Sequence, residues 1–68
     1  MDVFEIRGEY IMLNQLLKVL GWVESGAQAN LVIEEGNIYV NGQQELRKRN
    51  KIYKGMLVKF QEAEVEMI

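Results

Sequence analysis

The sequence has no cysteine, no histidine and no threonine, and its only serine is Ser25. Without cysteine the chain can form neither a disulfide framework nor a thiolate metal site, which fits a reducing compartment. Hydroxyl and thiol nucleophiles need an adjacent base, and hydrolytic metals usually need histidine, cysteine or clustered carboxylates. Catalysis is therefore disfavoured, and we expect no catalytic residue, no metal and no cofactor.

Glutamates are the remaining candidates for acid–base chemistry. Glu34 and Glu35 precede a glycine, and Glu62, Glu64 and Glu66 alternate near the C-terminus. Such chemistry needs a cleft that raises the pKa of one carboxyl group, and a domain this small rarely encloses one. We therefore expect a protein that is not an enzyme.

Length and hydropathy indicate one small domain outside the membrane. A chain of 68 residues forms a single domain, here residues 1–68, with a stability on the order of a few kcal/mol. The N-terminus is acidic and no long apolar run follows it, so the sequence indicates neither a secretory signal nor a membrane span. We expect a cytoplasmic monomer.

Positive charge is concentrated in one segment of an otherwise acidic chain. Five of the eight basic residues lie in residues 47–54, which contain no acidic residue, although the formal net charge of the chain is -2. Clustered cations repel one another and add little to folding, so such a segment usually serves an anionic partner. The alternative is a basic strand edge that only prevents aggregation.

The first helix is predicted from Ile11 onward, because its leucines follow the i, i+3, i+4, i+7 spacing of one helix face. These leucines are Leu13, Leu16, Leu17 and Leu20. Gly21 ends the helix, in a position that favours a left-handed residue. Trp22 follows in the turn, where we expect it to close the core; stacking on a base is the alternative.

The second helix is predicted to start at a capping box. In this motif the Ser25 hydroxyl accepts from the Gln28 amide, and the Gln28 side chain returns to the Ser25 amide. Its core stripe is Ala29, Val32 and Ile33. Gly36 ends the helix. Two helices separated by about four residues form a helix-turn-helix hairpin.

Strand patterns occupy the rest of the chain. Residues 37–40 alternate, and Asn41-Gly42 after them is a strong hairpin signal. Residues 56–60 also alternate, Val65 and Met67 could form a final edge strand, and residues 3–6 form either an edge strand or a tail. These elements predict an α+β domain, with two helices on one face of a small, mostly antiparallel sheet.

An extended basic segment would sort its side chains between two faces. Because side chains alternate along a strand, two sets are predicted. One face would carry Arg47, Arg49, Lys51 and Tyr53, and the other would carry Leu46, Lys48 and Ile52. Three cations and an aromatic ring would then point toward solvent together.

With these elements placed, the chain resembles the alpha-L RNA-binding domain family, or S-four domain, named for ribosomal small-subunit protein four. The resemblance rests on three segments, Leu16–Gly21, Ser25–Ala29 and Ile33–Gly42. Within this family, the amino-acid sequence of two segments is even more similar to the stand-alone YbcJ-like branch. These segments are Gly21–Ala29 and Glu45–Ile52. The family-like core covers residues 11–60.

The resemblance implies an alpha-L motif that binds structured RNA through its helix-turn-helix and the following hairpin loop. Where many members carry basic residues on the second helix, this chain has Gly26 and Asn30. That difference shifts the expected contact toward residues 47–54. Lys18 is then the best candidate on the first helix.

Our leading hypothesis from the sequence is docking on folded RNA, with ribosomal RNA or transfer RNA as targets and the ribosome or its precursors as partner in translation. The predicted RNA-binding residues are Lys18, Arg47, Lys48, Arg49, Lys51, Tyr53 and Lys54. The cations of residues 47–54 would engage phosphates, which position a protein without reading sequence. Tyr53 or Tyr39 could pack on a sugar or a base. Gln28, Asn30 and Asn41 could add hydrogen bonds, although each is also typical of a cap, a solvated side chain or a turn.

The rival hypothesis is a small module that docks on an acidic protein partner. It is based on Leu31, which lies off the core stripe of the second helix beside Ala27.

Overall fold

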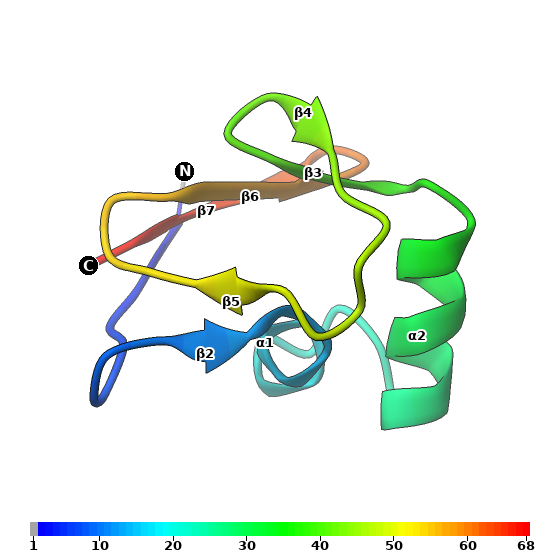
Figure 1. The fold of residues 1–68 in the computed structure, drawn as a ribbon, viewed down its shortest axis with the longest axis horizontal. Helices are drawn as coiled ribbons and strands as arrows, with labels where there is room; N and C mark the ends of the chain where they lie inside the picture. The colour runs from blue at the N-terminus through cyan, green and yellow to red at the C-terminus, as the bar shows by residue number, and fades with distance from the viewer. Residues whose placement is uncertain (1) are drawn as a thin grey trace.

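The computed structural model of the chain describes residues 2–68 and has an α+β architecture (Figure 1). Within these residues the helices are α1 (Leu13–Val19) and α2 (Gly26–Glu34). The strands are β1 (Asp2–Phe4), β2 (Ile11–Met12), β3 (Ile38–Val40), β4 (Gln43–Gln44), β5 (Lys51–Ile52), β6 (Leu57–Phe60) and β7 (Ala63–Met67). The predicted α+β class with two helices and a mostly antiparallel sheet is confirmed. Neither helix in the described range is long and apolar enough to cross a membrane.

The main sheet has five strands in the order β1-β7-β6-β3-β4. Only the pairing of β1 with β7 is parallel. Beyond that pairing, the Ile6 amide donates to the Ile68 carbonyl at 2.9 Å, and the Ile68 amide donates to Phe4 at 2.9 Å. The N-terminal segment is therefore an edge strand and not a tail.

The expectation that the last strand lies at an edge was wrong, because β7 lies between β1 and β6. Packing explains this position. Ile6 is 4% exposed and Phe4 packs against the core, so the N-terminal segment buries apolar side chains by adding itself beside β7.

The β3–β4 hairpin turns at Asn41 and Gly42, as predicted. Asn41 has φ 52° and Gly42 has φ 83°, and a two-residue turn with positive φ at both positions matches the twist of the flanking strands. The Asn41 side chain also accepts from the Leu57 amide at 2.9 Å. Asn41 is thus a turn residue that ties β3 to β6.

Helix α1 starts two residues later than predicted. Ile11 and Met12 pair with Ile52 and Lys51 and so form the small β2–β5 sheet. The expected leucine stripe is present: Leu13, Leu16 and Leu17 are fully buried, and Leu20 is partly buried against the core. Gly21 follows with φ 77°, the left-handed conformation expected at the end of the helix.

Helix α2 starts at the predicted cap, with one change of partner. The Ser25 hydroxyl accepts from the Gln28 amide at 3.1 Å. The Gln28 side chain returns to the amide of Glu24 at 2.8 Å, instead of that of Ser25. Ala29 and Ile33 are buried. The glutamine reaches one residue further back than in the standard capping box.

Residues 47–54 do not form one extended strand, which was the condition for the predicted alternation of side chains. The chain leaves the main sheet after β4, turns at residues 47–50, and re-enters a strand only at β5. The Asn50 amide donates to the Arg47 carbonyl at 3.2 Å, which closes the turn. β5 pairs with β2 and not with β3. The predicted division into two alternating faces therefore does not occur.

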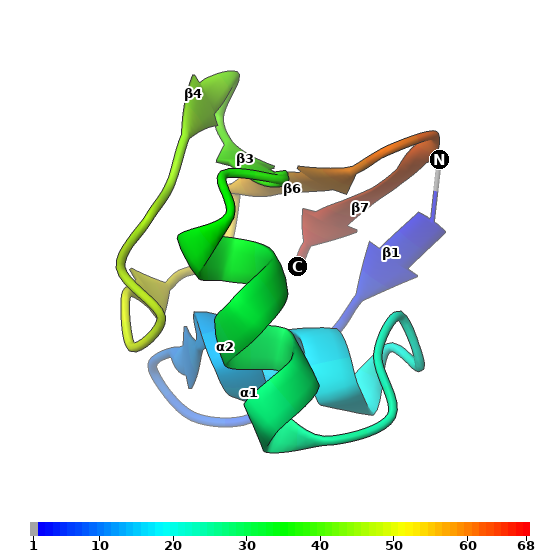
Figure 2. The ribbon, with the colours of Figure 1, turned by 90° about the vertical axis from the view of Figure 1, so that its right-hand side faces the viewer.

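The core lies between the main sheet and the layer that α1, α2 and the β2–β5 sheet form opposite it (Figures 1 and 2). Its largest fully buried side chains include Leu13, Ile33, Ile38 and Ile52. Trp22 is half-buried against this core, with its ring centroid 6.1 Å from that of Phe60. The packing interpretation of Trp22 fits this position.

Candidate nucleic-acid interface

The basic segment, residues 45–54, crosses from β4 to the end of the β2–β5 sheet and passes the start of α1 (Figure 1). Six of the seven predicted RNA-binding residues lie in it, and all six side chains are exposed. They are Arg47, Lys48, Arg49, Lys51, Tyr53 and Lys54. The structure thus gathers these residues on one stretch of surface.

Lys18 does not join this cluster. It is exposed in the last turn of α1, whereas the basic segment meets the first turn of that helix. Five residues of helix correspond to about 7 Å along its axis. Lys18 would therefore need a separate contact on the same ligand.

Main-chain hydrogen bonds hold the basic segment against α1. The Leu13 amide donates to the Asn50 carbonyl at 2.9 Å, and the Asn14 amide donates to the Lys48 carbonyl at 3.0 Å. The first amides of a helix have no partner within the helix, and Met12 at the cap offers no side-chain acceptor. The turn at residues 47–50 supplies the missing acceptors, so its shape is fixed by backbone contacts.

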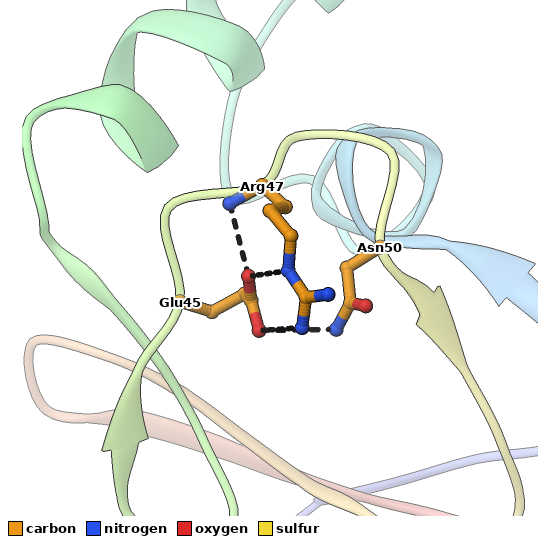
Figure 3. A network of polar contacts seen from close by, with 3 residues as sticks. All are labelled: Glu45, Arg47 and Asn50. Atoms are coloured by element: carbon orange, nitrogen blue, oxygen red, sulfur yellow. Dashed lines mark hydrogen bonds and ion pairs between the residues drawn. The ribbon is translucent and has the colours of Figure 1, made fainter.

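Glu45 organises the same turn from its other side (Figure 3). Its carboxylate accepts from the Arg47 amide at 3.0 Å and from the Arg47 guanidinium at 2.9 and 3.2 Å. It also accepts from the Asn50 side chain at 3.2 Å. The hydrogen bond from the Arg47 side chain is the main reason that the pKa of Glu45 lies below its ordinary value, although desolvation opposes the shift.

The cations differ in how far they are already engaged. Arg47 is paired with Glu45, and its pKa is raised by that contact. Lys48 pairs with Glu34 of α2 at 2.9 Å, with both side chains about half exposed. Among residues 2–68, no ion pair involves Arg49, Lys51 or Lys54. These three charges face solvent without a carboxylate partner.

An aromatic pair borders the free cations. The rings of Tyr10 and Tyr53 lie 5.9 Å apart between centroids and are tilted by 54°. The Lys51 ammonium lies 4.9 Å from the centroid of Tyr10. An open hollow of about 590 Å³ adjoins them, lined by Arg47, Arg49, Asn50, Lys51, Tyr53 and Met56.

Sequence reasoning missed two residues of this region, Tyr10 and Glu45. Tyr10 comes beside Tyr53 only because Ile11 pairs with Ile52, a pairing that no local pattern announces. Glu45 directly precedes the basic run, and a carboxylate two residues before an arginine was an available signal.

The polar side chains that were candidates for extra hydrogen bonds are occupied within the protein. Gln28 caps α2, and Asn41 bonds to Leu57. Asn30 accepts from the Asn14 side chain at 3.1 Å, which links the two helices. Each contact favours the structural role.

The arrangement of two helices, a mostly antiparallel sheet and an exposed basic turn matches a known class of domain. The S4 domain family model matches residues 4–68, so the chain belongs to the S4 domain family. Its similarity is to the YbcJ proteins within that class. YbcJ of Escherichia coli (strain K12) and YbcJ of Shigella flexneri are each 46% identical to it over 59 residues, which cover 87% of this chain and 84% of each relative.

A solved structure supports the same assignment. The solution structure of YbcJ from E. coli matches this fold with a TM-score of 0.75 and 42% sequence identity, and the match covers 100% of this chain and 87% of that one. That structure is described as revealing an alpha-L motif involved in RNA binding. The predicted resemblance to the alpha-L family and its YbcJ-like branch is thus confirmed.

Proposed function

We propose that this protein is a non-catalytic binder of structured RNA, with the basic segment as its main contact surface. The observation that carries the proposal is the group of Arg49, Lys51 and Lys54, which have no ion-pair partner within residues 2–68. Arg49 lies on the turn that α1 fixes, Lys51 lies on β5, and Lys54 follows β5. The E. coli relative with an alpha-L motif involved in RNA binding supports it. The absence of histidine and cysteine from the sequence favours binding over catalysis.

The mode of binding follows from the chemistry of the exposed groups. Lysine and arginine contact phosphates, which position a protein without reading sequence. Double-stranded RNA is recognised mostly by shape and by its backbone, since its major groove is too narrow for side chains. A rigid cationic turn suits a folded RNA surface, and ribosomal RNA and transfer RNA are the candidate targets.

The helices contribute less charge than the family resemblance implies. The exposed positions of α2 include Ala27, Gln28, Leu31 and Glu34, none of which is cationic. In the helix-turn-helix arrangement that we propose for the two helices, Lys18 of α1 is the only basic side chain of either helix. The contact is therefore centred on the basic segment.

The test is a fluorescence-anisotropy titration against a structured ribosomal-RNA fragment, a transfer RNA and a matched duplex DNA. With three free cations engaged, the logarithm of affinity should fall against the logarithm of salt with a slope of roughly two to three, between about 50 and 200 mM salt. Arg49→Glu/Lys54→Glu should weaken RNA binding by on the order of tenfold to a hundredfold.

Lys59→Glu supplies the matched control. Lys59 is an exposed lysine on β6 that forms no ion pair within residues 2–68, and its reversal changes the same kind of charge away from the basic segment. It should leave RNA affinity within about twofold. Equal losses in both variants, or equal binding to the DNA, would reduce the basic segment to a generic cation patch.

Docking on an acidic protein is the second candidate function. Leu31 is 55% exposed on α2 and offers an apolar contact to a protein partner, although a single exposed leucine is also normal on a protein surface. Leu31→Ser should remove such a partner, whereas RNA binding should be unchanged. Retention of RNA binding in Leu31→Ser together with its loss in Arg49→Glu/Lys54→Glu would favour the RNA function.

The cellular setting is part of the proposal. We propose that the protein acts as a cytoplasmic monomer on the ribosome or its precursors. Sedimentation of a lysate on a sucrose gradient at low and high salt would test this, because a phosphate-based contact should be released as salt rises.

A further inference from the structure

Two tyrosines at the edge of the basic segment lie exposed although they touch each other. Tyr10 is 37% exposed and Tyr53 is 41% exposed, and their rings are in contact across the β2–β5 pair. Their neighbours in the chain point the other way, with Ile52 fully buried and Ile11 half-buried against the core. The small sheet therefore buries its isoleucines, and the tyrosines that adjoin its two strands face solvent.

Internal contacts do not account for this exposure. Neither tyrosine hydroxyl forms a hydrogen bond with any other group of residues 2–68. A buried tyrosine hydroxyl usually finds such a partner, and tyrosine is enriched at interfaces, where one end of the side chain is apolar and the other is wet. The pair has apolar faces and free hydroxyl groups beside three unpaired cations.

The hollows beside Tyr53 have the chemistry of a nucleotide site. On one side Tyr53 lines the hollow with Arg49, Lys51 and Met56. On another side Tyr53 lines a smaller hollow with Gly8, Glu9 and Lys54, so an acidic residue adjoins Lys54 there. Cations that flank an aromatic ring suit a group that is flat and apolar in one part and anionic in the next. A nucleotide, with its base and its phosphate, meets both requirements.

The ring geometry decides how a base would fit. Stacked bases are about 3.4 Å apart, so a base held between two rings would need roughly 7 Å and parallel planes. The two rings lie 5.9 Å apart and are tilted by 54°, which leaves no such slot. A base would stack on one ring only, and Tyr53 is the ring that lines the hollow with Arg49. Tyr10 then supports Tyr53 from the side as a positioning residue.

We infer that Tyr53 stacks on a single unpaired base next to the RNA helix held by the basic segment. The inference rests on the proposed function and narrows its ligand to RNA with a bulge, loop or junction. A base inside a helix has both faces covered by its neighbours, whereas an unpaired base can be turned out onto an aromatic side chain. Arg49 and Lys54 would then contact the phosphates on either side.

The test compares three RNA hairpins that share one stem. One is fully paired, one carries a single-nucleotide bulge, and one carries an abasic site at the bulge, which keeps the phosphate and removes the base. Because stacking on an aromatic side chain is worth ~1–3 kcal/mol per base, the bulged RNA should bind at least about fivefold more tightly than the abasic one. A 2-aminopurine at the bulge should change its fluorescence on binding.

Variants of tyrosine separate stacking from folding. Tyr53→Leu keeps an apolar side chain and should remove the preference for the base, while its affinity for the abasic RNA stays within about twofold. Tyr53→Phe keeps the ring and should keep the preference. Tyr39→Leu is the matched control, since Tyr39 is 42% exposed but lies on β3 in the main sheet. Thermal melting by circular dichroism would check that each variant folds.

The outcomes distinguish this inference from the proposed function. Salt-sensitive binding with no difference between the bulged and abasic RNA, or a preference that persists in Tyr53→Leu, would overturn the stacking site and leave the RNA function standing. Absence of binding to every RNA would overturn both. If Tyr53→Leu loses the preference for the bulged over the abasic RNA and Tyr39→Leu keeps it, the stacking site at Tyr53 is established.

Discussion

The two ends of the basic segment look alike in the sequence and differ in the structure. At the first end, Arg47 and Lys48 are paired with Glu45 and Glu34. At the second end, Arg49, Lys51 and Lys54 form no ion pair within residues 2–68, and Lys51 lies over the ring of Tyr10. The comparison shows that a run of cations does not give each member the same availability to a ligand.

The difference has a structural origin. The first end is where the chain leaves the main sheet and turns, and the carboxylates of the neighbouring loop and of α2 stand beside that turn. The second end begins on the same turn with Arg49 and continues through β5 to Lys54, and the ring of Tyr10, just before β2, lies beside Lys51 and Tyr53. We therefore expect the first end to shape the segment and the second end to bind.

The largest effect should come from removing the support that both ends share. Ile52 is fully buried on β5. Ile52→Ala should cost about 2–5 kcal/mol of unfolding free energy, because it removes buried methyl groups and leaves a cavity. In a domain of this size that loss approaches the whole stability. Urea denaturation would measure it, with the exposed neighbour change Lys51→Ala as control, expected within about 0.5 kcal/mol.

A second prediction sets the two ends against each other in RNA binding. Arg49→Ala should weaken RNA binding by on the order of tenfold, as one charge-assisted contact is lost. Arg47→Ala should weaken it by about threefold or less, because its guanidinium already donates two hydrogen bonds to Glu45. Anisotropy titrations would measure both. Equal losses of RNA affinity in the two variants would mean that Arg47 contacts the RNA while it is paired with Glu45.

The salt dependence of RNA binding by the wild-type protein also tests whether one end of the basic segment or both ends contact the RNA. Three engaged cations correspond to a slope of roughly two to three, and all five to a slope of roughly 3.5 to 4.5. A slope in the upper range would show that both ends of the segment reach the RNA.

The third prediction concerns the pH dependence of the turn. Because the pKa of Glu45 in the folded protein lies below its ordinary value of 4.5, its contacts stabilise the fold fully above about that pH. The stabilisation is lost as the pH falls through the lower folded pKa. Wild type should therefore exceed Glu45→Gln in stability at pH 7, and the gap should shrink in acid.

Urea denaturation midpoints of both proteins from pH 7 down to about pH 3 would measure this gap in stability. The other carboxylates titrate in both proteins, so their contribution cancels in the comparison. Amide exchange at Leu13 and Asn14 gives a local readout, because both donate to carbonyls of the same turn. Faster exchange at these two amides in Glu45→Gln is expected. A gap that stays constant with pH would show that Glu45 is not held as a carboxylate by Arg47.

The smallest effect is expected from releasing Lys48. Glu34→Gln removes its partner, and an exposed pair of this kind contributes about 0–1 kcal/mol. Stability should change by less than about 0.5 kcal/mol, and RNA affinity should rise by about twofold or less as a fourth charge is freed. A larger gain would show that α2 restrains the basic segment.

Local patterns in the sequence predicted the elements that depend on neighbouring residues. The leucine stripe of α1, the Ser25 cap of α2 and the Asn41-Gly42 turn are each settled within a few residues. The features that sequence reasoning missed depend on distant pairing. Ile11 pairs with Ile52, so residues that were predicted as the start of a helix form β2. Asp2 pairs with Val65, which places β7 inside the sheet.

The candidate site divides in the same way. Its charges could be read from composition, because no folding step is needed to see a basic run. Which charges are free could not be read, since Glu34 lies 14 residues before Lys48 in the chain and approaches it only in the folded protein. Tyr10 was missed for the same reason.

The backbone bonds from the turn at residues 47–50 to α1 have one further consequence. The acceptors are the carbonyls of Lys48 and Asn50, which every amino acid possesses. The side chains at positions 48 and 49 are therefore exchangeable without disturbing the course of the main chain. The turn is a natural place for sequence drift to retune a ligand preference, and a suitable place for a protein engineer to graft a new recognition sequence onto a small scaffold.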